Sequence, residues 1–222
     1  MGVNPFTLAL LLCGILVVSV LLVLRRPSRL FTSLGTRIPR QLTLAAHEGP
    51  MPIDVRAPVE YLGDRLSGLG FQALNPVMRL PDFERLGHRL LLFAHHHPQE
   101  HALFLMAIES GLVPDAQLML HVLTPLDQGR RLETTTLAAL GSISSPKGVT
   151  LTVALDVDRV EELWHRHRRG LASFERSERR PPSAADWPQE VAEVYASWLQ
   201  AGVRAHRLVL DGRKARYRLR AG

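Results

Sequence analysis

Four histidines and one glutamate occupy the last seven positions of LLLFAHHHPQEH, residues 90–101. Successive side chains of a β-strand alternate between its faces, so His95 and His97 share one face and His96 lies on the other. If residues 98–100 form a hairpin loop, His101 lies across from His97 on that same face. Three imidazoles with an open position suit zinc or another divalent cation. One hypothesis is therefore a metal site at His95, His97 and His101, with Glu100 or His121 as a further ligand.

The alternative is that these histidines are solvated side chains at the end of a strand. Polar residues are expected where a strand runs into a turn, and no HExxH motif accompanies the cluster. His165 and His167 do not extend it, because residues two apart on a helix diverge by about 200°. The stretch favours a hairpin over a metal site, so no cofactor is predicted and zinc remains the alternative.

The C-terminal segment is strongly basic. The dipeptide Asp211-Gly212, flanked by alternating residues, predicts a β-hairpin. After the turn, alternate residues form a basic stripe on one face of the strand: Lys214, Arg216, Arg218 and Arg220. The other face carries Ala215, Tyr217 and Leu219. This stripe could bind anionic lipid headgroups or the phosphate backbone of a nucleic acid. The alternative is that the arginines only keep an exposed edge strand soluble and prevent it from pairing with other strands. Tyr217 alone is present for base stacking, which makes nucleic acid the less favoured partner.

Residues for nucleophilic catalysis are not evident. The sequence has no GxSxG motif and no glycine-rich phosphate loop. Its single cysteine, Cys13, excludes an internal disulfide and a cysteine-based zinc site within one chain. The serines near Lys147 lie in a segment typical of a loop. No catalytic residue is predicted, and a binding role is favoured over an enzymatic one.

The N-terminal segment predicts a membrane anchor. Residues 5–24 contain no charged side chain, and about twenty residues of helix cross roughly 30 Å of hydrocarbon. Arg25 and Arg26 follow the run directly and no basic residue precedes it, which favours an uncleaved anchor over a signal peptide. The positive-inside rule then places the C-terminal part in the cytoplasm, at a bacterial inner membrane.

The chain of 222 residues, with 46% hydrophobic residues and a formal charge of +6, has room for one medium domain. We predict a tail at 1–4, a transmembrane helix at 5–24, a juxtamembrane connector at 25–52 and an α+β domain at 53–222, whose residues 204–220 form the hairpin. Apolar spacing predicts helices within 57–70, 156–174 and 189–202. Strand-like segments predict an antiparallel meander of about five to seven strands, with the helices packed on one face of the sheet. These strand-like segments are residues 71–80, 88–97, 101–110, 116–125, 131–140 and 148–158.

Three stretches carry a resemblance: LTPLDQGRRLETTT at 123–136, LGF at 69–71 and ELWHRHRR at 162–169. Together they resemble an uncharacterised group of bacterial membrane-anchored α+β proteins, over residues from about 55 to 180. That group has Asp-Gly at the end of a strand, where this chain has Asp127-Gln128-Gly129. The resemblance implies the α+β fold and an N-terminal anchor, and it implies no activity and no site residue.

The leading hypothesis is a single-pass membrane protein whose cytoplasmic domain binds an unknown protein partner or organises an assembly. A second hypothesis is a membrane-tethered metal-dependent enzyme or metal sensor that uses the histidines at 95, 97 and 101. A third is an adaptor that binds anionic lipid or nucleic acid through the basic stripe.

Overall fold

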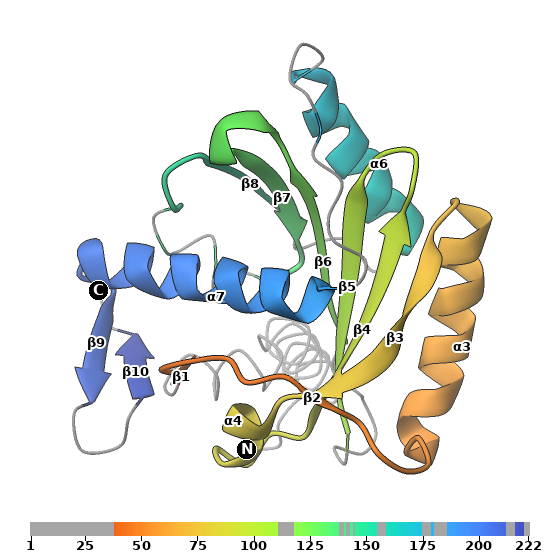
Figure 1. Cartoon of the computed structure of the whole chain (residues 1–222), viewed down its shortest axis with the longest axis horizontal. Coiled ribbons are helices and arrows are strands. Elements are labelled where there is room, and N and C mark those ends of the chain that lie inside the picture. Colours follow the sequence, from red (N-terminus) through yellow and green to blue (C-terminus); the bar gives the residue numbers. More distant parts are fainter. Residues whose placement is uncertain are drawn as a thin grey trace, which may run out of the picture.

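The computed structural model describes residues 38–110, 118–137, 140, 143, 145–154, 159–174, 179, 186–211 and 216–219. The main feature is a seven-stranded sheet in the order β2-β3-β4-β5-β6-β7-β8 (Figure 1). Its strands are β2 (Ala45–Ala46), β3 (Gln72–Arg79), β4 (Leu90–His97), β5 (Ala102–Glu109), β6 (Leu118–Pro125), β7 (Arg131–Thr135) and β8 (Val149–Val153). The α+β architecture and the predicted strand segments agree with this sheet.

Strands β3 to β7 form the predicted antiparallel meander, but the last strand departs from it. Each of these strands pairs antiparallel with the next in the chain, whereas β8 pairs parallel to β7, with Arg131 opposite Val149. A parallel pair requires the chain to cross back before the second strand begins. An entirely antiparallel sheet is therefore wrong at this edge.

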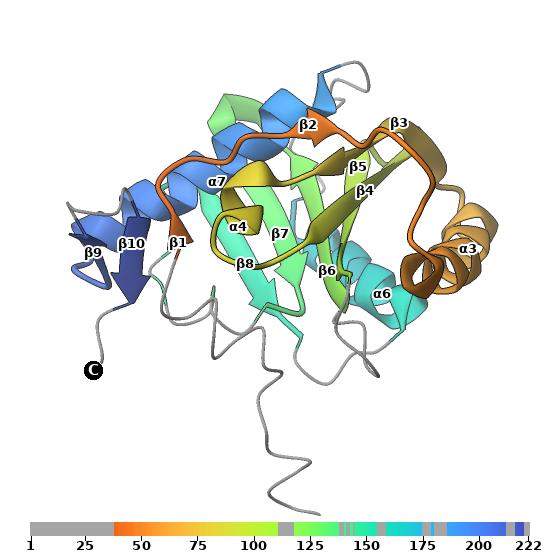
Figure 2. The ribbon, with the colours of Figure 1, turned by 90° about the horizontal axis from the view of Figure 1, so that it is seen from below.

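Four α-helices are present in the described part of the chain, and they cover both faces of the sheet. Helices α3 (Ile53–Gly68) and α6 (Val160–Ala172) pack on one face, and α7 (Trp187–Arg204) lies across the other. The short helix α4 (Pro81–Glu84) joins β3 to β4. Figure 2 shows the sheet between α7 on one side and α6 on the other. The prediction that all helices lie on one face is therefore wrong.

Two faces are covered because the central strands are apolar at successive positions. Phe93 and Phe104 face α3 and α6, whereas Leu92 and Leu105 face α7. A sheet whose strands are apolar on both sides must bury both sides. Continuous runs such as LLLFA in β4 carried this signal, and an alternating pattern would have indicated one exposed face.

The predicted transmembrane helix is a second correction to the fold class. Across the described ranges, no helix is long and apolar enough to cross a membrane. Helices α3, α6 and α7 carry charged residues on the side turned away from the sheet, and α4 has a single turn. The predicted span itself, residues 5–24, lies outside the described residues.

A second, three-stranded sheet lies beside the first. Strands β9 (Leu208–Asp211) and β10 (Arg216–Leu219) pair antiparallel in the segment expected to form a hairpin, and β1 (Ile38–Pro39) pairs with β10. Residues of the predicted connector thus take part in both sheets through β1 and β2. Leu42 and Leu44, between these two strands, pack against the core on the α7 face.

Candidate functional site

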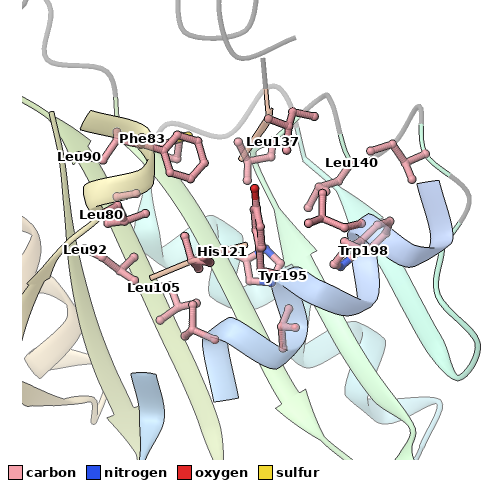
Figure 3. A pocket seen from close by; sticks show the side chains of 18 of the residues that line it. Leu80, Phe83, Leu90, Leu92, Leu105, His121, Leu137, Leu140, Tyr195 and Trp198 are labelled. Carbon is pink, nitrogen blue, oxygen red and sulfur yellow. The ribbon is translucent and has the colours of Figure 1, made fainter. Parts of the chain in front are cut away.

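A cavity of about 250 Å³ lies between the sheet and helix α7 (Figure 3). Strands β4, β5 and β6 form its floor, and α7 forms the opposite wall. Nearly all side chains that line it are apolar; those labelled in the close-up are Leu80, Phe83, Leu90, Leu92, Leu105, His121, Leu137, Leu140, Tyr195 and Trp198. The cavity is partly open to solvent, and a concave, mostly apolar lining of this kind is typical of small-molecule sites.

The size of the cavity sets the size of a ligand. An apolar cavity of roughly 150 Å³ is large enough to hold benzene and stays free of water when it is empty. The present cavity of about 250 Å³ therefore accommodates a ligand of roughly ten non-hydrogen atoms. Its lining predicts that such a ligand is mainly hydrocarbon.

Among the described lining residues, three carry a nitrogen or oxygen atom in the side chain, and two of these groups are engaged in hydrogen bonds. The Tyr195 hydroxyl donates to the Pro39 carbonyl at 2.7 Å, and burial raises the pKa of this phenol. Trp198 Nε1 donates to Glu133 Oε2 at 2.8 Å. His121 is the third, and it projects from β6 into the floor of the cavity.

His121 is backed by a buried carboxylate. Glu133, fully buried on β7, accepts a short hydrogen bond from Arg131 Nε through Oε1, and its Oε2 lies 3.4 Å from His121 Nε2. Arg131 also donates to Ser197 Oγ on α7 at 2.5 Å. Burial alone would raise the pKa of Glu133, but His121 and Arg131 outweigh that effect and lower it to about 2. Glu133 is thus a carboxylate at neutral pH, and it links β6, β7 and α7.

The opposite face of the sheet holds a separate polar contact. His167 on α6 is fully buried, with Nε2 2.9 Å from Thr124 Oγ1 and Nδ1 3.0 Å from Thr134 Oγ1. Burial lowers the pKa of His167 to about 3, so the ring is neutral. A hydroxyl both donates and accepts, so the two threonines satisfy both ring nitrogens. This arrangement anchors α6 to the sheet and leaves no ring nitrogen for a ligand.

The structure separates the three histidines of the predicted metal site. His95 and His97 lie on one face of β4 as predicted, both buried. His97 pairs with Ala102, so the hairpin loop spans residues 98–101, one residue more than the loop that would have placed His101 across from His97. His101 lies in that loop at a φ of 51°. Burial, then the charges of His101 and His97, lower the pKa of His96.

The two histidines on the α6 side are packed as core residues. His97 stacks on Trp164 with ring centroids 5.4 Å apart and meets Phe71 edge-on at 5.0 Å. Its Nδ1 accepts the backbone N–H of Glu100 at 3.3 Å. Burial lowers the pKa of His95 to about 4. In the part of the chain that the structure describes, no group of three or more His, Cys, Asp or Glu side chains is placed to hold a metal ion.

The two further ligands considered from the sequence are engaged elsewhere. The Glu100 carboxylate forms ion pairs with Arg168 at 3.6 Å and with Arg179 at a shorter distance. His121 lies on the α7 face next to Glu133, on the other side of the sheet from His95. Zinc or another divalent cation as a cofactor stays the alternative considered from the sequence.

The basic stripe is described only in part. Arg216 is half-buried and lies across from Asp211 in β9 and Pro39 in β1. The backbone of Arg218 pairs with Val209, and its side chain lies outside the description, as do Lys214 and Arg220 altogether. Binding of anionic lipid or nucleic acid there, a membrane partner through residues 5–24, a protein partner and an inner-membrane location stay predictions.

The sequence interpretation missed the cavity and the carboxylate behind it. The only available signal was RLETTT, where Arg131 and Glu133 alternate with Leu132 and Thr134, which indicates that two charged residues share one face of a strand. No family model matches the chain, and neither the curated proteins nor the solved structures include a significant match.

Proposed function

We propose that this protein binds a small, mainly apolar molecule in the cavity between the sheet and helix α7. The observation that carries the proposal is the cavity of about 250 Å³ and its lining, in which leucine predominates. Transfer of hydrocarbon from water into such a site is favourable by roughly 25 cal/mol for each Å² of apolar surface buried. The proposal differs from the role expected from the sequence, which was binding of an unknown protein partner or organisation of an assembly.

The exposed apolar surface supports the same proposal. The cavity is partly open to solvent, and nearly all of its lining is apolar. A bound hydrocarbon covers this apolar surface and gains dispersion contacts with it.

The lining favours binding over catalysis. Among the described lining residues there is no serine, threonine, cysteine, lysine or carboxylate, and the hydroxyl of Tyr195 is held by the Pro39 carbonyl. Trp198 and Tyr195 direct their polar atoms at Glu133 and at the Pro39 carbonyl instead. The cavity thus has the composition of small-molecule sites, which are mostly apolar with few polar groups.

The proposal is tested by calorimetric titration with nonan-1-ol, a molecule of ten non-hydrogen atoms, against the wild type and two variants. Ala107→Phe places an aromatic ring in the cavity, because Ala107 lines it. Ala73→Phe, at an exposed position of β3, is the matched control. We expect saturable binding to the wild type and to Ala73→Phe, and at least tenfold weaker binding to Ala107→Phe. Absence of binding to the wild type, or equal binding by all three proteins, would contradict the proposal.

A further inference from the structure

We infer that the ligand of the cavity carries one hydrogen-bond donor, a hydroxyl or N–H group on an otherwise apolar frame, and that Nδ1 of His121 accepts this hydrogen bond. The inference rests on the proposed binding function and adds the chemical class of the ligand. The claim concerns an uncharged molecule, such as an alcohol, a phenol or an amide, of roughly ten non-hydrogen atoms, as the cavity volume allows.

Among the described lining residues, His121 is the one whose polar side chain remains available for a hydrogen bond to a ligand. The Tyr195 hydroxyl is bound to the Pro39 carbonyl, and Trp198 Nε1 is bound to Glu133. His121 projects from the middle of β6, whose neighbours at that position are Leu105 on β5 and Thr135 on β7. Its side chain is 11% exposed, and it lies among the lining residues in Figure 3.

The carboxylate of Glu133 determines which ring nitrogen of His121 carries the proton. His121 Nε2 lies 3.4 Å from Glu133 Oε2, which is an ion-pair distance without hydrogen-bond geometry, and the negative charge of the carboxylate attracts an N–H group rather than a lone pair. A neutral imidazole has one N–H group and one lone pair, and its hydrogen-bond partner decides which nitrogen carries the proton. The carboxylate therefore places the proton on Nε2 and leaves the lone pair on Nδ1. Within the described residues no group donates a hydrogen bond to Nδ1.

The charges already present beside His121 favour an uncharged ligand. Glu133 is already paired with Arg131, whose side chain is 18% exposed, so these two charges cancel. An anionic ligand would bring a further negative charge into an apolar cavity that already holds the carboxylate of Glu133. Burial of charge is costly even when the charges are paired. An uncharged donor meets the lone pair of Nδ1 without any change of charge, so the surroundings of His121 favour it.

The test compares two isomers of equal size and composition. Nonan-1-ol and methyl octyl ether contain the same atoms, and only the alcohol donates a hydrogen bond. We expect the wild-type protein to bind the alcohol about five- to tenfold more tightly than the ether, the effect of one net hydrogen bond in a buried site. Nonanoate serves as an anionic probe of nearly the same length, and we expect it to bind more weakly than the alcohol.

Three variants locate the effect. His121→Leu removes the acceptor while Glu133 keeps Arg131 and Trp198 as partners, so this variant is expected to bind both isomers equally. Glu133→Gln no longer directs the proton to Nε2, and we expect it to reduce the preference for the alcohol. His165→Leu changes an exposed histidine of α6 and is expected to retain the full preference.

The possible outcomes separate the inference from the function on which it rests. Equal binding of the two isomers to the wild type overturns the inference and leaves the cavity as an apolar site. Retention of the preference in His121→Leu also overturns it, because the acceptor then lies elsewhere. Tighter binding of nonanoate than of the alcohol overturns it in favour of an imidazolium at His121. Failure of all three probes to bind the wild type contradicts the proposed function itself.

Discussion

Trp198 Nε1 donates a hydrogen bond of 2.8 Å to Glu133 Oε2 and so joins helix α7 to the sheet at the edge of the cavity. The two residues are 65 positions apart in the chain, and both are buried. The same carboxylate also holds Arg131 and stands behind His121. Glu133 therefore helps to position both helix α7, which forms one wall of the cavity, and His121, the polar group in the cavity floor.

Replacement of Trp198 by phenylalanine tests this link. We expect Trp198→Phe to lower the free energy of unfolding by about 1–3 kcal/mol, because the charged acceptor loses one of its donors while most of the packing stays. Trp187→Phe is the matched control: Trp187 is buried on the same helix, and within the described residues its Nε1 has no hydrogen-bond partner. Urea unfolding of both variants measures the difference, and a greater loss in Trp187→Phe would argue against the role of the hydrogen bond.

Acid sensitivity is expected from Glu133. Its pKa is lowered from 4.5 to about 2 in the folded protein, so its contribution to stability is present above pH 4.5 and is lost as the pH falls towards 2. The difference between the two values corresponds to roughly 3 kcal/mol, of which about 2 kcal/mol is lost by pH 3. Urea unfolding at pH 6 and pH 3 should show this loss in the wild type and not in Glu133→Gln. An equal loss in both proteins would mean that other groups govern the acid response.

His167 is expected to remain neutral in mildly acidic solution. Burial lowers its pKa from 6.5 to about 3, so the unfolded chain takes up a proton before the folded one does. The stability contributed by this residue is complete above pH 6.5, and about 2 kcal/mol of it is lost by pH 5. Ring ¹⁵N chemical shifts measured from pH 7.5 to pH 5 should show a neutral imidazole throughout. An imidazolium signal at pH 5 would show that the hydroxyls of Thr124 and Thr134 do not enclose the ring.

Gly202 is expected to be required where α7 meets β9. A Cβ atom at this position would lie 2.6 Å from Leu208 Cδ1, so Gly202→Ala forces the leucine to move and should cost about 1–3 kcal/mol. Gly68 lies at the end of α3 with open space around it, and Gly68→Ala should be neutral or stabilise by up to about 1 kcal/mol. Thermal unfolding compares the two variants. A Gly202→Ala protein as stable as the wild type would show that this contact is looser than described.

The sequence was sufficient to predict the three long helices and most strands. Apolar spacing predicted a helix within residues 156–174, where α6 occupies Val160–Ala172, because a helical period requires only local information. The length of the hairpin loop could not be decided from the sequence, because His101 adopts a left-handed conformation, which a non-glycine residue seldom shows. The parallel pairing of β8 depends on the path of the chain between strands, which leaves no periodic signal.

The cavity was beyond prediction for a different reason. It is a space left where α7 crosses the sheet, and its lining comes from residues as distant as Ile38 and Leu208. No local pattern records how closely two packed elements approach. The contact of His121 with Glu133 likewise depends on the register of β6 against β7, which places His121 opposite Thr135.

The most direct test of the central claim is methyl ¹³C NMR of two methionines that lie on opposite faces of the sheet. Met119 lines the cavity, whereas Met106 packs in the core between the sheet and the helices α3 and α6. Titration with nonan-1-ol is predicted to shift the Met119 methyl signal in a saturable manner and to leave the Met106 signal in place. A Met119 signal that does not respond, or a response of equal size at Met106, would contradict the claim that the cavity beneath α7 is the binding site.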